Sequence, residues 1–508
     1  MSKKPTNKLT GLEIGTYSVG SLGREVSNNC INVFFLAFLN IYMGLDVLVL
    51  TVAFVLAKLW DTVNDPMLAA LVNNSKKGRF GRFRPWMLLG AILNCAALIL
   101  CFYPVGFANV TLKYVYYIGL YIVWGMTFTI VDVPFWSMIP TIADTTEDRN
   151  KVSSWSKLVG GFGGFVVSSI GTSLIIPKIA VTKGAPWAHF ILGITAGGMI
   201  LCFMLVTVIC NREKYDLPES KISLKEILNL FKSNDQLRAY AVSYVLFVGG
   251  TTISLFQIIY VFIYYGDMGG LKYLSQGLGY TVFTAVACTG QGIAMIFYSL
   301  IVKKISREKI YGANYFMAII GMTGLFFIFF LLKPEYSFLE NSKAMWLNVI
   351  AVALAGAFLM TSNGLNQIGS TVMIADVVDY GEWKTGQRSD SVIFSVQTLL
   401  TKFAGAIAML IIGVGIKVAH LPSIVQEFDE ATQTFYYQFI FGNGEQITTG
   451  ALDILRVFMF LVPIPLILVG YLVYHKKYWL YGERYDQIKQ EIDERRKAGV
   501  SADSTDVS

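Results

Sequence analysis

The sequence predicts an all-α integral membrane protein with about twelve membrane-spanning helices arranged as six plus six. The first observation is composition: the 508 residues are 54% hydrophobic and only 15% charged. The mean hydropathy of +0.55 is too high for an ordinary soluble protein. The second is that apolar runs of about 20 residues, the length that crosses a bilayer, recur along the chain. The third is a polar stretch that divides these runs into two sets of six.

The apolar runs occupy most of the chain. They lie near residues 28–45, 47–73, 86–104, 113–141, 156–177, 189–210, 239–265, 280–302, 312–332, 345–368, 391–419 and 453–474. The first six end near Cys210, and six more follow the polar stretch. We therefore predict an N-terminal six-helix bundle over 1–210, a linker over 211–238, a C-terminal six-helix bundle over 239–475 and a tail over 476–508.

Three connecting segments have patterns of their own. Ser223 and Glu226 form a capping box that predicts a short amphipathic helix in the linker, on the membrane surface. The loop over 420–450 holds an aromatic cluster and is expected either to pack on the surface or to cap an external vestibule. The alternating charges of 487–496 predict a solvated helix in the tail.

Basic residues gather at three connections that lie on one side of the membrane if the spans alternate. These are Lys76, Lys77, Arg79, Arg82 and Arg84, then Lys303, Lys304, Arg307 and Lys309, then Lys476 and Lys477. By the positive-inside rule this side is the cytoplasm, which predicts a multi-pass protein of the cell membrane with both termini inside. The clusters account for the net charge of +7 without nucleic-acid binding. No cleavable signal peptide is evident, and the six cysteines are expected to be buried thiols.

Two carboxylates interrupt the second apolar run. Asp61 and Asp65 are four residues apart and share a helix face. Ionised carboxylates at membrane depth are costly unless they are paired or face a polar cavity. Pro66 has no N–H for the Thr62 carbonyl, and Asn64 adds an amide. This set of oxygens suits a hard monovalent cation or a proton, and the alternative is a buried polar cluster that only fixes helix packing.

The fourth run carries a second group on one helix face: Gly125, Thr129, Asp132 and Trp136. The small Gly125 permits close approach of another helix, and the Thr129 hydroxyl can ligate a cation. The Asp132 carboxylate beside the flat Trp136 ring suits a sugar, whose hydroxyls need acceptors and whose C–H face packs on aromatic rings. The alternative is that Trp136 belongs to the apolar core.

Lys402 lies inside the eleventh run, one turn after Thr398. A buried ammonium needs an anion, and the candidates are Asp61, Asp65 and Asp132 in the other half of the chain. A cation that enters between the aspartates would compete with Lys402 and alter the affinity for sugar.

Three further charged residues are ambiguous by position alone. Glu25 precedes the first run, Lys157 lies early in the fifth, and Arg24 adjoins Glu25 and can pair with it.

Together these motifs resemble the glycoside–pentoside–hexuronide:cation symporters of the major facilitator superfamily, and in particular their melibiose-carrier-like members. The resemblance rests on Asp61-Thr-Val-Asn-Asp-Pro66, Gly81-Arg-Phe-Arg-Pro-Trp86, Asp132-Val-Pro-Phe-Trp136, Asp376-Val-Val-Asp-Tyr-Gly-Glu382 and Ser395-Val-Gln-Thr398 with Lys402. It implies the major-facilitator fold of two six-helix bundles and alternating access around a central cavity.

The resemblance also implies roles for individual residues. The cation region would comprise Asp61, Asp65, Asn64, Thr129 and Lys402, with Asp61 and Asp65 as Na⁺ ligands if the coupling ion is sodium. The sugar region would comprise Glu25, Asp132, Trp136 and Lys157, with Thr398 and Arg24 as further candidates. Glu25 and Lys157 stand where the melibiose carriers have Asp and Arg, which keeps the charges and changes their reach.

The predicted function is secondary active symport of a glycoside, pentoside or hexuronide with Na⁺ or H⁺ into the cell. The expected partners are a small sugar, a monovalent cation and membrane lipid, with no cofactor besides the co-transported ion. The alternative on the same fold is a sodium-coupled carrier of a lipid-like amphiphile. An intramembrane aspartyl hydrolase is disfavoured because Asp61 and Asp65 lie on one turn and cannot flank a substrate, so no enzyme is predicted.

Overall fold

The fold was obtained as a computed structural model. It describes residues 9–73, 75, 77–143, 145–215, 231–265, 278–331, 343–385, 390–420, 423–429, 434–440 and 449–503. The amphipathic helix predicted in the linker after Ser223 lies outside the described residues.

The N-terminal half consists of helical segments that cross the bundle six times. They are α1 (Gly11–Cys30) continued by the π-helical turns η1 (Ile31–Phe35) and η2 (Phe38–Tyr42), α2 (Val47–Asn73), α3 (Arg84–Cys101), α4 (Val110–Ile142), α5 (Thr146–Ile170) continued by η3 (Gly171–Ile175) and α6 (Ile176–Lys183), and α7 (Ala185–Cys210).

The C-terminal half repeats this layout. It consists of α9 (Asp235–Tyr265), α10 (Leu278–Lys304), α11 (Arg307–Leu331), α12 (Lys343–Thr385), α13 (Asp390–Val418) and the last crossing, built from α14 (Thr449–Arg456), η4 (Val457–Leu461) and α15 (Pro463–Lys477). A two-stranded hairpin, β1 (Ser423–Asp429) and β2 (Thr434–Ile440), precedes the last crossing, and α16 (Gly482–Asp503) follows it.

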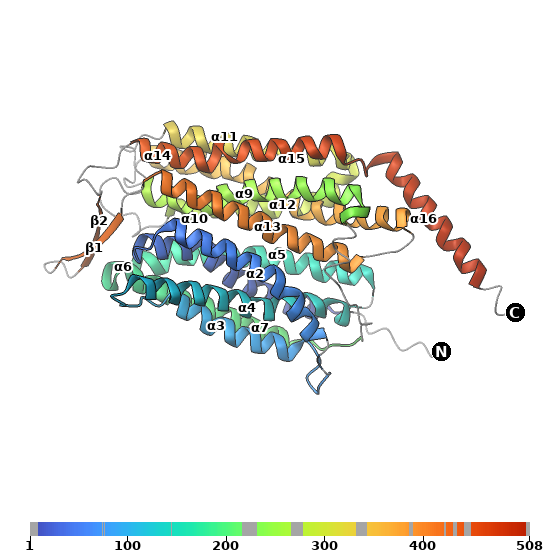
Figure 1. The fold of residues 1–508 in the computed structure, drawn as a ribbon, viewed down its shortest axis with the longest axis horizontal. Helices are drawn as coiled ribbons and strands as arrows, with labels where there is room; N and C mark the ends of the chain where they lie inside the picture. The colour runs from blue at the N-terminus through green and yellow to red at the C-terminus, as the bar shows by residue number, and fades with distance from the viewer. Residues whose placement is uncertain are drawn as a thin grey trace.

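The two halves form separate bundles that lie side by side (Figure 1). This confirms the predicted all-α fold of two six-helix bundles. Within the described residues, six helical stretches are long and apolar enough to cross a membrane by length and composition. Both termini lie at one end of the molecule, which we call the terminus end, and the β1–β2 hairpin lies at the other, which we call the hairpin end (Figure 1).

The first helix begins earlier than hydropathy predicted. Thr10 caps α1 in a capping box with Glu13, so the helix starts at Gly11. Its second half contains Arg24 and Glu25, which the apolar-run criterion had placed before the span. The charged and amide side chains lower the local hydropathy although the helix is packed inside the bundle, where Arg24 is only 8% exposed.

Glu213, just after α7, caps the start of α3. Its carboxylate accepts hydrogen bonds from the backbone N–H groups of Arg82, Phe83 and Arg84, at 2.8, 2.7 and 3.3 Å. A helix N-terminus favours such a negative charge. Gly81 has φ +90° and lies so close to the carboxylate that a Cβ would not fit. The Gly81–Trp86 motif therefore joins two helices of the N-terminal half.

Replacing Glu213 with Ala is expected to lower the free energy of unfolding by about 1–3 kcal/mol, because three part-buried backbone donors lose their charged acceptor. The melting temperature of purified protein in detergent measures this. Glu483→Ala, at the exposed start of α16, is the matched control and is expected to melt like the wild type. Equal melting temperatures for all three proteins would contradict the proposed role of Glu213.

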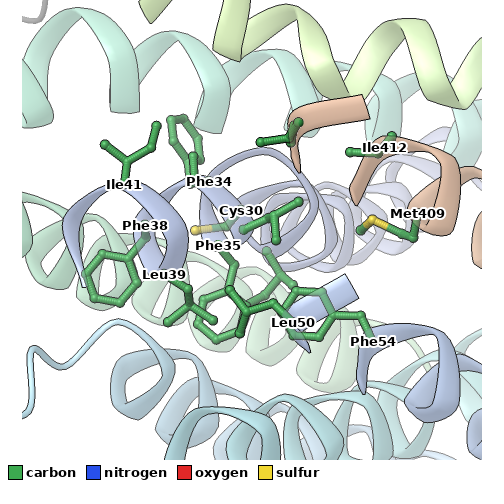
Figure 2. Packing of buried hydrophobic residues seen from close by; sticks show 14 of the residues in the cluster. Cys30, Phe34, Phe35, Phe38, Leu39, Ile41, Leu50, Phe54, Met409 and Ile412 are labelled. Atoms are coloured by element: carbon green, nitrogen blue, oxygen red, sulfur yellow. The ribbon is translucent and has the colours of Figure 1, made fainter. Parts of the chain in front are cut away.

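The two bundles are packed together at the hairpin end. One continuous apolar cluster contains Phe34, Phe35 and Phe38 after α1, Leu50 and Phe54 of α2, and Met409 and Ile412 of α13 (Figure 2). Beside it, Gly413 of α13 leaves no room for a Cβ against Thr51 of α2, and the Lys417 ammonium pairs with the Asp46 carboxylate.

At the terminus end the apolar cores are separate. One cluster of the N-terminal half contains Met87 and Phe135, and one of the C-terminal half contains Val377 and Tyr474. No buried cluster among the described residues joins the halves there. The conformation is therefore closed at the hairpin end.

The described part of the loop over 420–450 is the β1–β2 hairpin, which the sequence analysis had not assigned as strands. Its strands pair antiparallel, with Phe428 opposite Phe435, and their aromatic and β-branched residues favour this conformation. Although it belongs to the C-terminal half, β1 contacts η2 and β2 contacts α6. The loop therefore reaches across to the N-terminal half.

The tail helix α16 is not fully solvated, contrary to the prediction from its charges. Ile488 and Ile492, four residues apart, are each 4% exposed and pack into a core cluster of the C-terminal half. Tyr485 donates a hydrogen bond of 2.8 Å to Asp379 of α12, and the Trp383 indole donates one of 2.7 Å to Glu491. An apolar pair at helical spacing inside a charged segment is the signal that was overlooked.

Candidate functional site

The cation cluster, as we call Asp61, Asp65, Thr129, Lys402 and Lys58, is centred on Asp65 of α2. The Thr129 hydroxyl of α4 lies 2.9 Å from Asp65 Oδ1, and the Lys402 ammonium of α13 pairs with Asp65 Oδ2. One carboxylate thus binds a hydroxyl of its own half and an ammonium of the other half. The structure selects Asp65 from the three aspartates that the sequence offered as partners of Lys402.

Asp61 lies one turn before Asp65 and is 7% exposed. A Cβ added at Gly125 of α4 would lie 3.0 Å from Asp61 Oδ1, so the absence of a side chain at Gly125 lets this carboxylate approach the backbone of α4. Asn64 is 5% exposed, and its side-chain nitrogen has no hydrogen-bond partner among the described residues. Asp61 and Asn64 thus place further buried polar side chains beside Asp65.

Lys58 completes the cation cluster and was missed by the sequence analysis. Its ammonium lies 5.8 Å from the centroid of the Trp124 ring, and its charge interacts with both Asp61 and Asp65. The signal was its position in α2, three residues before Asp61 and seven before Asp65, which places all three on one face. With two lysines and two aspartates, the formal charge of the cluster is zero.

The sugar cluster, as we call Arg24, Glu25, Asp132 and Trp136, joins α1 to α4. The Arg24 guanidinium donates to Asp132 Oδ1 at 2.5 Å and to Glu25 Oε1 at 2.6 Å. The Trp136 indole N–H donates to the same Asp132 oxygen at 3.1 Å. Arg24 also lies 5.1 Å from the centroid of the Trp136 ring, a cation–π distance. Four of the six residues predicted for the sugar region thus form one connected group.

Small residues bring α5 close to this group. A Cβ at Gly160 would lie 2.7 Å from Ser21 Oγ and 3.0 Å from Glu25 Cγ, so any larger residue would displace the acid. Close approach of helices at glycines is typical of membrane bundles. On its other side Glu25 accepts a hydrogen bond of 3.3 Å from the Asn29 amide.

Two predicted sugar residues lie apart from the sugar cluster. Lys157 of α5 donates to the Thr371 hydroxyl of α12 at 3.3 Å, a contact between the halves that the sequence did not predict. Thr398 is exposed on α13, one turn before Lys402, and forms no hydrogen bond with another candidate among the described residues.

One helix connects the two clusters. Thr129, which binds Asp65, and Asp132, which binds Arg24 and Trp136, are three residues apart on α4. A change at Asp65 can therefore reach the sugar cluster through less than one turn of helix. Two linked polar clusters inside an apolar bundle are typical of a transporter.

Comparison with known proteins agrees with this geometry. Residues 16–479 match the family described as "MFS/sugar transport protein". The chain belongs to this family. The resemblance inferred from the motifs is thereby confirmed, and the protein is a multi-pass membrane transporter on the major-facilitator fold, not an enzyme.

Several relatives are named as sugar carriers. The chain is 24% identical to a lactose permease of Lactobacillus delbrueckii subsp. bulgaricus, over 97% of this chain and 73% of the permease. It is 22% identical to an isoprimeverose transporter of Lactiplantibacillus pentosus, over 84% and 85% of the two chains. The crystal structure of a D-xylose–proton symporter superposes with a TM-score of 0.60 at 14% identity, over 91% and 97%, which shows the shared fold.

Proposed function

We propose that this family member carries a sugar into the cell together with a monovalent cation, Na⁺ or H⁺, by alternating access. The observation that supports the proposal most directly is that Asp65 binds both Lys402 of the other half and Thr129. Thr129 in turn lies three residues before Asp132 on α4. The names of the relatives, which include lactose, raffinose and isoprimeverose carriers, support a small sugar as the substrate.

The coupling follows from competition for Asp65. A cation that binds among the Asp65, Asp61 and Asn64 oxygens neutralises the anion that Lys402 needs, so the ion pair between the halves weakens. An entering proton has the same effect on Asp65. Thr129 then changes its hydrogen bond, and α4 passes this change to Asp132. A cation that alters sugar affinity in this way has its own affinity altered by sugar to the same extent.

The sugar is held by both polar and apolar groups: hydrogen-bond acceptors, a hydrogen-bond donor and an aromatic ring. The carboxylates of Asp132 and Glu25 accept hydrogen bonds from its hydroxyls, Arg24 donates to them, and the Trp136 ring packs against its C–H face. In the absence of sugar these groups satisfy one another, which keeps the charges paired inside the membrane.

The direction of opening depends on orientation. The basic residues near the start of α3 and the end of α15 lie at the terminus end, so the positive-inside rule assigns that end to the cytoplasm. The conformation, closed at the hairpin end, is then inward-facing. The cell membrane is its proposed location, with both termini inside.

The test is uptake by proteoliposomes of a labelled panel of galactosides, xylosides and glucuronides under an imposed Na⁺ gradient and, separately, a proton gradient. Accumulation of one sugar class with one gradient is the expected result and identifies substrate and ion together. Absence of accumulation for every sugar under either gradient would overturn the proposal. Uptake of a lysolipid in the same vesicles would then support the amphiphile carrier.

A further inference from the structure

The predicted sugar residues come almost entirely from the N-terminal half. A carrier that changes access by moving two bundles must also hold its substrate with the second bundle, since only then does occupancy alter the contact between them. Among the described residues, the one hydrogen bond of a predicted N-terminal sugar residue with the C-terminal half runs over 3.3 Å from Lys157 Nζ to Thr371 Oγ1. Thr371 has no role in the function described above.

The Lys157 ammonium has unused hydrogen-bonding capacity. It carries three donors, and among the described residues its one acceptor is the Thr371 hydroxyl. No described carboxylate lies within ion-pair distance of it. A half-buried ammonium held by a single neutral hydroxyl can therefore donate to a ligand without breaking an ion pair.

The Thr371 hydroxyl is oriented to accept. It lies 3.0 Å from the Gln367 carbonyl of its own helix, to which it donates. Because its own proton is used in this bond, the Thr371 oxygen can only accept further hydrogen bonds, and one of these comes from Lys157. A sugar hydroxyl is donor and acceptor at once, so it can accept from Lys157 and donate to Thr371 in place of the direct bond.

The surrounding face of α12 is polar. Asn363, Gln367 and Thr371 follow one another at four-residue spacing and share a face. Next to it, Ser370 accepts a hydrogen bond of 3.2 Å from the Gln397 amide of α13, which fixes this part of α12 against its neighbour. A polar stripe inside a membrane bundle faces a polar cavity or another polar group.

We propose that Thr371 is a sugar-binding residue that, with Lys157, selects one hydroxyl of the sugar. The inference rests on the proposed function, because it assumes that the site binds a sugar. One hydroxyl joins the two bundles through these residues, so a sugar that lacks it, or has it in the other configuration, binds less tightly. Thr371 thereby contributes a specificity element of the C-terminal half.

The test uses Thr371→Val, which keeps the shape and removes the hydroxyl, and Thr371→Ser, which keeps the hydroxyl. Uptake in proteoliposomes is measured with the sugar identified for the wild type and with its series of monodeoxy analogues. Thr371→Val is expected to raise KM for the full sugar about 3- to 10-fold, as loss of one neutral hydrogen bond does. Thr371→Ser is expected to stay near the wild type.

The decisive readout is the analogue series. For one deoxy position, the wild type and Thr371→Ser lose affinity strongly, whereas Thr371→Val loses less, because one of the two partners of that hydroxyl is already gone and only Lys157 remains. A merely structural role of Thr371 would raise KM for all analogues in proportion. That outcome, or an unchanged KM in Thr371→Val, overturns the inference.

The control is Thr195→Val in α7, whose hydroxyl, within the part of the chain that the structure describes, bonds only to the Ile191 carbonyl of its own helix. It is expected to leave KM and the analogue pattern unchanged. Wild-type uptake of the sugar in the same vesicles separates the two proposals: if the wild type accumulates sugar and Thr371→Val behaves like it, only the assignment of Thr371 fails. If the wild type accumulates no sugar, the proposed function itself fails.

Discussion

Replacing Asp65 with Asn is expected to abolish cation-driven accumulation of sugar. With a tenfold imposed cation gradient and no membrane voltage, a carrier that couples one cation to one sugar can accumulate the sugar up to about tenfold, since a tenfold ratio is worth about 1.4 kcal/mol. The variant lacks the anion that both the cation and Lys402 require, so its accumulation ratio should stay near one. Labelled sugar inside and outside proteoliposomes at the plateau gives the ratio.

Loss of a carboxylate also leaves Lys402 as an unpaired charge, which is costly inside a bundle and can impair folding. The double variant Asp65→Asn with Lys402→Gln removes both charges and separates the two effects. It is expected to recover the melting temperature of the wild type without recovering accumulation. Asp148→Asn, in the first turn of α5, is the control for loss of an acid. Normal accumulation by Asp65→Asn would refute the assignment of Asp65.

The cation region was partly predictable because its spacing is local. Asp61 and Asp65 share a face of any helix drawn through them, and Thr129 and Asp132 share another. No local rule says which acid meets Lys402, because the partner lies 337 residues away along the chain. Lys58 also lies at helical spacing from Asp61 and Asp65. It was overlooked because its position was not compared with those of the acids one and two turns later in the same apolar run.

In the sugar region, the sequence-based prediction placed two charged residues outside the membrane span. Hydropathy placed Arg24 and Glu25 before the first span, although α1 begins at Gly11, buries Arg24 and half-buries Glu25. Charges that neutralise one another inside a bundle lower a sequence average without being exposed to water. The contact between Lys157 and Thr371 depends on how the two bundles pack, and a pattern within one helix cannot predict it.

The hairpin end is where the two bundles share a core, so under the proposed alternating access it is the end that separates when the carrier opens to the other side. The separation would break the Asp46–Lys417 pair and expose apolar surface of the cluster around Phe35, Phe54 and Met409 (Figure 2). The energetic cost of that exposure must be offset by new contacts, and at the terminus end the separate cores leave both bundles free to form them.

Asp132→Asn is expected to weaken sugar binding about 100-fold or more. The Asp132 carboxylate receives hydrogen bonds from the Arg24 guanidinium and the Trp136 indole, and charge-assisted hydrogen bonds contribute about 1.5–3 kcal/mol each. The neutral amide loses the ion pair, leaves Arg24 with Glu25 alone, and offers the sugar a weaker acceptor. Equilibrium dialysis of labelled sugar against purified protein measures the affinity.

The same variant keeps the cation cluster, since Asp65, Thr129 and Lys402 are untouched. Direct binding of the coupling ion in the absence of sugar should therefore stay within about threefold of the wild type, while the change in ion affinity caused by sugar disappears, because linkage between two ligands requires both to bind. Asp486→Asn, on the exposed side of α16, is expected to leave both measurements unchanged. If Asp132→Asn binds sugar normally, the sugar does not contact Asp132. If it loses ion binding as strongly as sugar binding, the two clusters form a single site, and α4 then does not relay a signal between them.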